Sequence, residues 1–354
     1  MAYASNQLGK VSREFLETVI FRNLGARDQS VLVGPGHGLD NSVLSLSNDR
    51  VLILTADPLS LIPALGAKDS AWLTVQLLAS DFTTSGVGPQ FAMFDFNLPP
   101  ELDLSVFASY IKAIGAECKK LGVAIVGGHT GKYEGCDFTI IGGGVLLGTA
   151  GSDEYLTPAM ARVGDKVIMT KGAAIAATGV LARAFPQKVG DELGRKAMRK
   201  AGTFVRSCTT VKDALTASAL GKGAITGMHD ATEGGVLGGL HELSSACGKA
   251  VIVNKDKVYV SRETRAVCSL FGLDPLITLS EGTLLITSRP DRAVEVQRKL
   301  RRSGIPNFVV GEIDGRHRNG VWVSEGGSAF RRYVPAAVDP YWAAFAEATK
   351  RGWA

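Results

Sequence analysis

Four aspartates occupy strand ends or tight turns, where an acidic side chain can reach a bound ion. They are Asp40, Asp57, Asp81 and Asp230. Hard carboxylate oxygens from separate segments, without a matching set of histidines and cysteines, suit Mg²⁺ shared between the protein and nucleotide phosphates. A single aspartate of this kind is more often a turn or cap residue. For the four together, the structural and the metal-binding interpretations both stay open.

Two glycine-rich turns form the second group of candidates, because a turn without side chains lets the backbone approach a phosphate closely. Gly127 and Gly128 follow an apolar strand and lead into His129 and Thr130. Gly234 precedes a helix whose first amides could face an anion. Neither segment has the pattern of a P-loop or of a dinucleotide-binding turn. Each glycine pair alone is more often a plain tight turn.

Three single side chains have open interpretations. His129 either contacts a phosphate or metal or only hydrogen-bonds its own turn. Lys10 follows a glycine in the N-terminal segment, and is either a phosphate contact on a mobile arm or an ordinary exposed lysine. Cys136 has no evident base nearby, which favours an inert thiol over a nucleophile.

Strands that alternate with long helices would position these residues. The apolar patterns predict strands at 42–46, 51–56 and 123–126, a helix from about residue 69 that leads to Asp81, and an apolar segment at 223–229 that leads to Asp230. This alternation indicates an α/β (α+β) architecture. A polar, proline-containing passage at 148–164 is the best boundary candidate. We therefore expect domains over 1–155 and 156–335, followed by a helical tail over 336–354.

Composition excludes several classes of protein. The chain has 354 residues and a net charge of +5, and its basic runs lie in helix-like stretches without interleaved aromatics, which argues against a nucleic-acid partner. Its five cysteines form neither a C-x-x-C pair nor a zinc spacing. No apolar segment approaches the roughly 20 residues of a membrane span, and no signal-peptide pattern is present. We expect a soluble, cytoplasmic protein with no membrane partner.

Taken in order, the acidic and glycine-rich segments resemble the signatures of the aminoimidazole ribonucleotide (AIR) synthetase superfamily. This family uses Mg-ATP and includes selenophosphate synthetase, thiamine-monophosphate kinase and the hydrogenase maturation factor HypE. Residues 274–282 look most like the HypE branch, although the chain ends in Gly-Trp-Ala354 without that branch's Pro-Arg-Ile-Cys tail. The resemblance covers about residues 8–335. It is carried by Gly-Leu-Asp40-Asn-Ser-Val-Leu, Thr-Ala-Asp57-Pro-Leu, Ser-Asp81-Phe, Ile-Val-Gly-Gly-His129-Thr, His-Asp230-Ala-Thr-Glu-Gly-Gly-Val, Asp274-Pro-Leu-Ile-Thr-Leu-Ser-Glu-Gly and Gly304-Ile-Pro-Asn-Phe-Val-Val-Gly-Glu-Ile.

The resemblance implies an N-terminal half whose strands pair with a second subunit in a dimeric β-barrel. It also implies a C-terminal α/β half packed against the first, with ATP in the cleft between them. It makes Asp40, Asp57, Asp81 and Asp230 the metal ligands, and Asp81, His129 and Thr130 the catalytic residues. The implied cofactor-binding residues are Lys10, Asp57, Gly127, Gly128, Thr130, Asp230 and Gly234.

The function implied by the resemblance is Mg-ATP-dependent activation of a small acceptor or carrier group by phosphoryl transfer. Mg²⁺ and ATP are the expected cofactors, and the acceptor is unassigned. The alternative is an ATP-binding accessory or maturation scaffold that docks a partner protein without turnover of its own. Formation of a product from ATP distinguishes the two.

Overall fold

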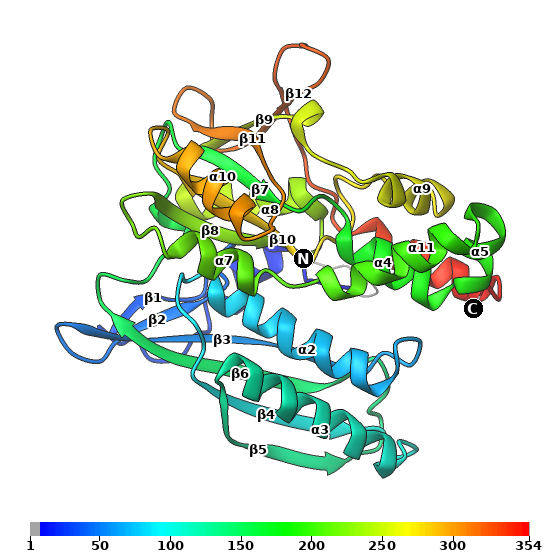
Figure 1. Ribbon diagram of the computed structural model, residues 1–354. Coiled ribbons are helices and arrows are strands. Elements are labelled where there is room, and N and C mark those ends of the chain that lie inside the picture. Colours follow the sequence, from blue (N-terminus) through cyan, green and yellow to red (C-terminus); the bar gives the residue numbers. More distant parts are fainter. Residues whose placement is uncertain (1–7, 354) are drawn as a thin grey trace.

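Two sheets, one from each half of the chain, organise residues 8–353, the part that the computed structural model describes (Figure 1). The first sheet has the strand order β1-β2-β3-β6-β4-β5. Every neighbouring pair in it is antiparallel except β4 and β5. Its strands are β1 (Val31–Val33), β2 (Ser42–Ser45), β3 (Arg50–Ser60), β4 (Phe91–Leu98), β5 (Ala124–Lys132) and β6 (Ile140–Gly151).

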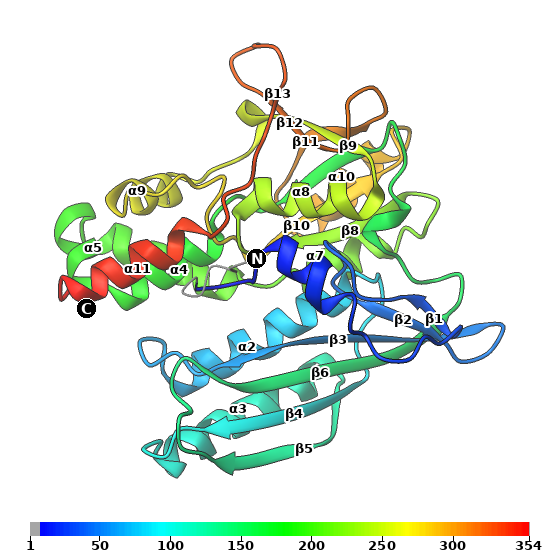
Figure 2. The ribbon, with the colours of Figure 1, turned by 180° about the vertical axis from the view of Figure 1, so that it is seen from behind.

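Alternation of side chains along the strands gives the first sheet one apolar face. In β3, Val51, Ile53 and Leu59 are buried, because residues two apart point to the same side of a strand. Helices α2 (Gly66–Thr83) and α3 (Leu104–Leu121) cover that face. Seen from behind in Figure 2, the strands β6, β4 and β5 lie in front of these helices. The first half is therefore a two-layer unit with one open sheet face.

The second sheet has helices on both faces. Its order is β13-β12-β9-β11-β7-β10-β8. One side packs on α8 (Gly235–Cys247), and the other packs on α7 (Val211–Ser218) and α10 (Ala293–Arg302). Because both faces are covered, β8 and β10 are buried along their whole length. The strands are β7 (Lys166–Thr170), β8 (Ile225–Ala231), β9 (Ala250–Asn254), β10 (Thr283–Ser288), β11 (Asn307–Asp314), β12 (Gly320–Ser324) and β13 (Arg331–Arg332).

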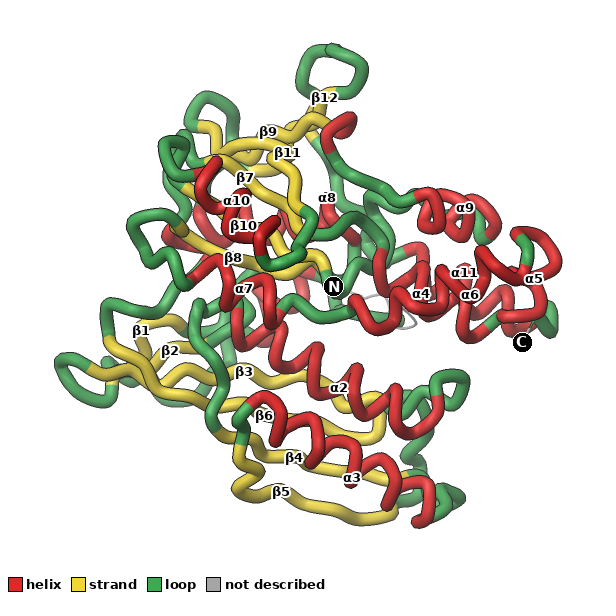
Figure 3. The backbone as a smooth tube through the Cα atoms, in the orientation of Figure 1, coloured by secondary structure: helices red, strands yellow, loops and turns green. Residues whose placement is uncertain are grey.

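A group of helices projects to one side of the second sheet (Figures 1 and 3). They share an apolar core in which the rings of Phe185 and Phe345 lie 5.1 Å apart. The C-terminal segment contributes one helix to this group. The helices are α4 (Ile175–Ala184), α5 (Pro186–Leu193), α6 (Arg195–Gly202), α9 (Arg262–Leu270) and α11 (Pro340–Lys350), while α1 (Arg13–Phe15) and a π-helical turn (Leu16–Ile20) stand at the N-terminus.

The α/β architecture is confirmed, and three local expectations need correction. The helix that carries Asp81 begins at Gly66, and Asp57 lies inside β3 rather than at its end. Gly127–Thr130 form the middle of β5 rather than a turn after it. Glycine fits that strand because a Cβ on Gly128 would lie 1.8 Å from the carbonyl oxygen of Phe94. Among residues 8–353, no helix combines the length and the apolar character needed to cross a membrane.

Candidate functional site

The structure brings the four aspartates together at the boundary between the two halves. Asp57 comes from β3 and Asp81 from the last turn of α2, whereas Asp230 comes from β8 in the other half. The loop before β2 supplies Asp40, and its neighbour Asn41 donates a 2.8 Å hydrogen bond to the carbonyl of Asp81. Oxygen atoms of Asp40 and Asp230 lie within 4.8 Å of each other, the spacing of ligands around one cation.

These carboxylates raise one another's proton affinity. Burial raises the pKa of Asp230 to about 7 and that of Asp57 to about 6, with Asp40 adding to both effects. Burial and the nearby Asp230 raise the pKa of Asp81 well above its usual range. Like charges held close in a dry site are costly unless a cation lies between them. We call Asp40, Asp57, Asp81 and Asp230 the acidic cluster. Its hard oxygen donors come from four segments and therefore fit Mg²⁺.

Sequence reasoning missed His229 and Glu242, which complete this cluster. The Nδ1 atom of His229 lies 2.9 Å from a carboxylate oxygen of Asp40, and Nε2 lies 3.0 Å from Glu242. Only 4% of the His229 side chain is exposed. Burial alone would lower the pKa of His229, but the two carboxylates raise it well above its usual value. His229 therefore joins a carboxylate of the first half to a carboxylate of the second. Its position next to Asp230 in β8 is the sequence signal that could have revealed His229 as a site residue.

Lys10 lies at the edge of the acidic cluster. Its Nζ atom is 3.1 Å from Thr232 Oγ1 and 3.3 Å from Glu242 Oε1, while its backbone amide donates to Glu233. The nearby carboxylate of Glu242 raises the pKa of Lys10. About half of the lysine side chain is exposed. The charged amine is thus placed beside the site and open to solvent, a position suited to a phosphate contact.

Gly234 caps α8, and its backbone amide already has an anionic partner. The amide donates a 2.7 Å hydrogen bond to Asp339, whose other carboxylate oxygen caps α11 through the amide of Tyr341. Burial raises the pKa of Asp339 to about 6. The amide that we expected to face a nucleotide phosphate therefore binds the chain's own carboxylate in this structure.

Gly127–Thr130 lie apart from the acidic cluster of the same chain. The strand register places Asp57 opposite Gly144, Gly144 opposite Phe94, and Phe94 opposite Gly128. Three inter-strand spacings of about 4.8 Å put Gly128 about 14 Å from Asp57 across the sheet. The structure therefore does not join these residues to the metal-binding candidates within one chain.

His129 and Thr130 point to opposite faces of the sheet, because successive residues of a strand alternate. His129 is exposed and makes a 2.7 Å hydrogen bond with the hydroxyl of Tyr133. Within this strand conformation, only one of the two can face a given phosphate. A hollow of about 390 Å³ lies along this edge of the sheet and is lined by Phe94, Phe96, Ile111, Ile125 and Gly127–Thr130.

Comparison with known proteins gives matches along both halves. The family profile described as AIR synthase related protein, N-terminal domain, matches residues 38–149, and the corresponding C-terminal domain matches residues 162–324. A protein of Methanocaldococcus jannaschii, provisionally named a hydrogenase expression/formation protein, is 24% identical over 295 residues, which are 83% of this chain and 84% of that protein.

Two solved structures share the fold. AaThiL complexed with AMPPCP and TMP has a TM-score of 0.69 at 17% identity, covering 91% of this chain and 97% of that one. The hydrogenase maturation protein HypE in complex with ATP has a TM-score of 0.64 at 19% identity, covering 96% and 98%. With both family profiles matched in order over most of its length, the chain belongs to the AIR synthase related protein family.

Proposed function

We propose that the chain binds Mg-ATP at the acidic cluster and activates a small acceptor or carrier group by phosphoryl transfer from ATP. The observation that carries this proposal is the convergence of Asp40, Asp57, Asp81 and Asp230 from both halves of the chain. ATP or its analogue AMPPCP in two structures of the same fold supports the choice of nucleotide.

The residues present can perform the tasks that phosphoryl transfer requires. Mg²⁺, when bound, neutralises charge on the β- and γ-phosphates. Asp81 and Asp230 would hold it, with Asp40 and Asp57 orienting it or a second ion. His229 keeps Asp40 in place, and Lys10 offers a further positive charge toward the phosphates. Catalysis at such a site depends on positioning and electrostatics rather than on a covalent intermediate.

We further propose that the active form is a homodimer built on the open face and edge of the first sheet. Phe91, Met93, Ile125 and Val126 expose 43–58% of their surface there, on strands β4 and β5. An unpaired edge strand with exposed apolar side chains is a ready surface for a second strand. A second copy would cover this surface and could bring its own Gly127–Thr130 to the acidic cluster, as the family resemblance implies.

A second candidate function is that of an ATP-binding maturation or accessory protein. Its support is the similarity to a protein named for hydrogenase expression and formation, and to HypE, which is named as a hydrogenase maturation protein. Such a protein would bind ATP and a partner protein without consuming the nucleotide alone.

The two functions differ in what happens to ATP. The purified protein would be incubated with γ-labelled ATP, Mg²⁺ and a fraction of small metabolites, with the Asp81→Asn variant as control. Label transferred to a new compound, or ADP formed only by the wild type, supports the enzyme. Tight binding with no consumption of ATP under any of these conditions favours the accessory role.

A further inference from the structure

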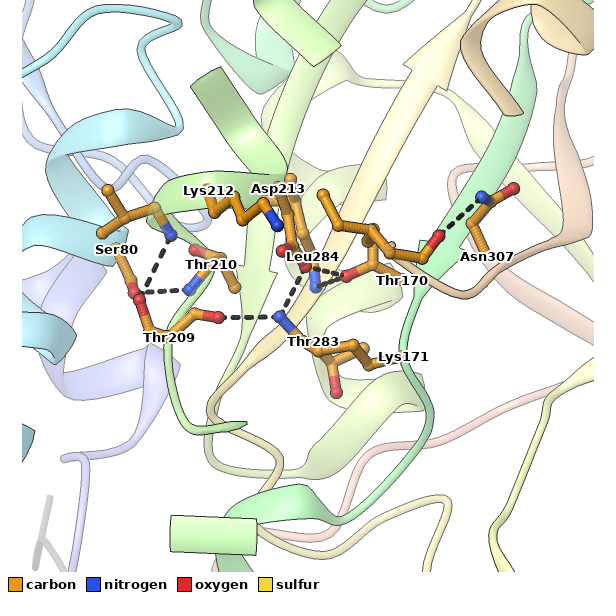
Figure 4. A network of polar contacts seen from close by, with 12 residues as sticks. Ser80, Thr170, Lys171, Thr209, Thr210, Lys212, Asp213, Thr283, Leu284 and Asn307 are labelled. Atoms are coloured by element: carbon orange, nitrogen blue, oxygen red, sulfur yellow. Dashed lines mark hydrogen bonds and ion pairs between the residues drawn. The ribbon is translucent and has the colours of Figure 1, made fainter. Parts of the chain in front are cut away.

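A network of polar contacts joins helix α2, which carries Asp81, to the second half of the chain (Figure 4). Its centre is the pair Thr209 and Thr210, which directly precedes α7. On one side the pair contacts two residues of α2, and on the other it contacts Lys171, which directly follows β7. The network therefore crosses the same boundary that the four aspartates cross.

The contacts to α2 fix its last turns. The hydroxyl of Ser80 accepts a 2.9 Å hydrogen bond from the amide of Thr210 and donates one of 2.7 Å to the carbonyl of Gln76. The hydroxyl of Thr209 donates to the side-chain oxygen of Gln76. Ser80 is only 1% exposed and directly precedes Asp81 in the sequence.

An ion pair holds the other side of the network. Lys171 donates a 2.7 Å hydrogen bond to the carbonyl of Thr209 and pairs with Asp213, which also accepts a 2.6 Å hydrogen bond from Thr170. The side chains of Lys171 and Asp213 are 19% and 5% exposed. Lys171 has φ +57°, a left-handed conformation that a non-glycine residue keeps only when its surroundings favour it.

Mg²⁺ demands near-ideal octahedral geometry, so its ligands must be held closely in place. Asp81 belongs to the first half and Asp230 to the second, so the distance between them depends on contacts that cross the boundary, such as those of Ser80 with Thr210. We propose that Ser80, Lys171 and Asp213 are positioning residues that hold Asp81 at the correct distance from Asp230. This inference depends on the proposed function only in treating Asp81 as a Mg²⁺ ligand.

The test compares Ser80→Ala with Ser244→Ala. Ser244 is a matched control, because it is a fully buried serine of helix α8. Its hydroxyl accepts a 2.9 Å hydrogen bond from the amide of Gly320 and donates a 2.6 Å hydrogen bond to the carbonyl of Lys249. Both variants lose the same kind of hydrogen bond, but only Ser80 precedes a proposed metal ligand. A third variant, Asp213→Asn, removes the negative charge that pairs with Lys171 and keeps the shape of the side chain.

The first measurement is amide hydrogen exchange of the full chain without nucleotide. We expect Ser80→Ala and Asp213→Asn to speed exchange at residues 81–84 and 209–213, and Ser244→Ala to leave both segments unchanged. This result supports the positioning role whether or not ATP binds. Equal exchange at residues 81–84 in wild type and both network variants would overturn the inference.

The second measurement is the Mg²⁺ concentration that gives half-maximal ATP binding. Ser80→Ala should raise this Mg²⁺ concentration about tenfold or more, because that is the usual effect of losing a residue that orients a metal ligand. The affinity for ATP without Mg²⁺ should stay constant. Ser244→Ala should change the Mg²⁺ concentration less than about twofold. The same Mg²⁺ requirement in both variants contradicts the inference, whereas a wild type without any Mg²⁺ effect contradicts the proposed function instead.

Discussion

Replacing Asp230 with asparagine should stabilise the nucleotide-free protein above neutral pH, although the change removes a proposed Mg²⁺ ligand. Asp230 is 2% exposed and lies among other carboxylates. Asparagine has the same shape and no charge. The variant therefore isolates the cost of holding this charge in the folded protein without its cation.

The magnitude follows from the pKa of Asp230, which burial and Asp40 raise from 3.8 to about 7. A folded-state pKa raised by about 3 corresponds to roughly 4 kcal/mol of lost stability once the pH exceeds 7. The cost begins at the pKa of the unfolded chain and grows until the pH passes that of the folded protein. The carboxylate of Asp230 also has a side-chain hydrogen bond with Asp81, and asparagine weakens this bond, which is worth about 1 kcal/mol. We therefore expect a net gain of roughly 1–3 kcal/mol at pH 8 and a smaller gain at pH 5.

The assay is thermal unfolding of wild type and Asp230→Asn at pH 5 and pH 8, each with and without Mg²⁺. The variant should unfold at a higher temperature than the wild type at pH 8, and the difference should shrink at pH 5. Mg²⁺ should stabilise only the wild type, because a ligand that binds the folded state raises its stability. A variant that is less stable by the same amount at both pH values would refute the reasoning and make Asp230 a structural residue.

Four further predictions concern single residues. His229→Asn should lower the free energy of unfolding in urea by roughly 3–5 kcal/mol, since it leaves Asp40 and Glu242, whose side chains are only 11% and 12% exposed, without their shared partner; a loss below about 1 kcal/mol would mean that this bridge is weak. Lys10→Ala should weaken ATP binding up to about tenfold in calorimetry and leave the unfolding temperature unchanged, because the side chain is half exposed; unchanged affinity would remove Lys10 from the site. Gly128→Ala should destabilise the first sheet by about 2 kcal/mol or more, because its Cβ would collide with the backbone, and unchanged urea unfolding would contradict the observed strand pairing. Val126→Glu should convert a dimer into monomers in analytical ultracentrifugation without loss of helix content, and a dimer that persists would place the interface elsewhere.

The sequence was sufficient to predict the α/β class and most of the elements that position the site. Asp40, Asp57, Asp81 and Asp230 could be chosen because each stands beside an apolar strand or helix face, and the structure places all four at one boundary. Their role as metal ligands remains a prediction.

The contacts between the two halves could not be predicted, because no local pattern encodes them. His229 meets Asp40 across 189 residues of sequence, and Ser80 meets Thr210 across 130. The glycines of β5 were misplaced for a different reason. A glycine pair usually favours a turn, but here glycine fits a strand because the neighbouring backbone approaches too closely for a side chain.

Calorimetric titration with ATP, with and without Mg²⁺, of the wild type and Asp81→Asn tests the central claim most directly. Loss of one charged ligand should abolish the Mg²⁺-dependent part of the binding while the variant remains folded. We predict Mg²⁺-dependent binding of ATP by the wild type and its absence in Asp81→Asn. Equal Mg²⁺-dependent affinity in the two proteins, or no binding of ATP by the wild type, would contradict the assignment of this cluster as a Mg-ATP site.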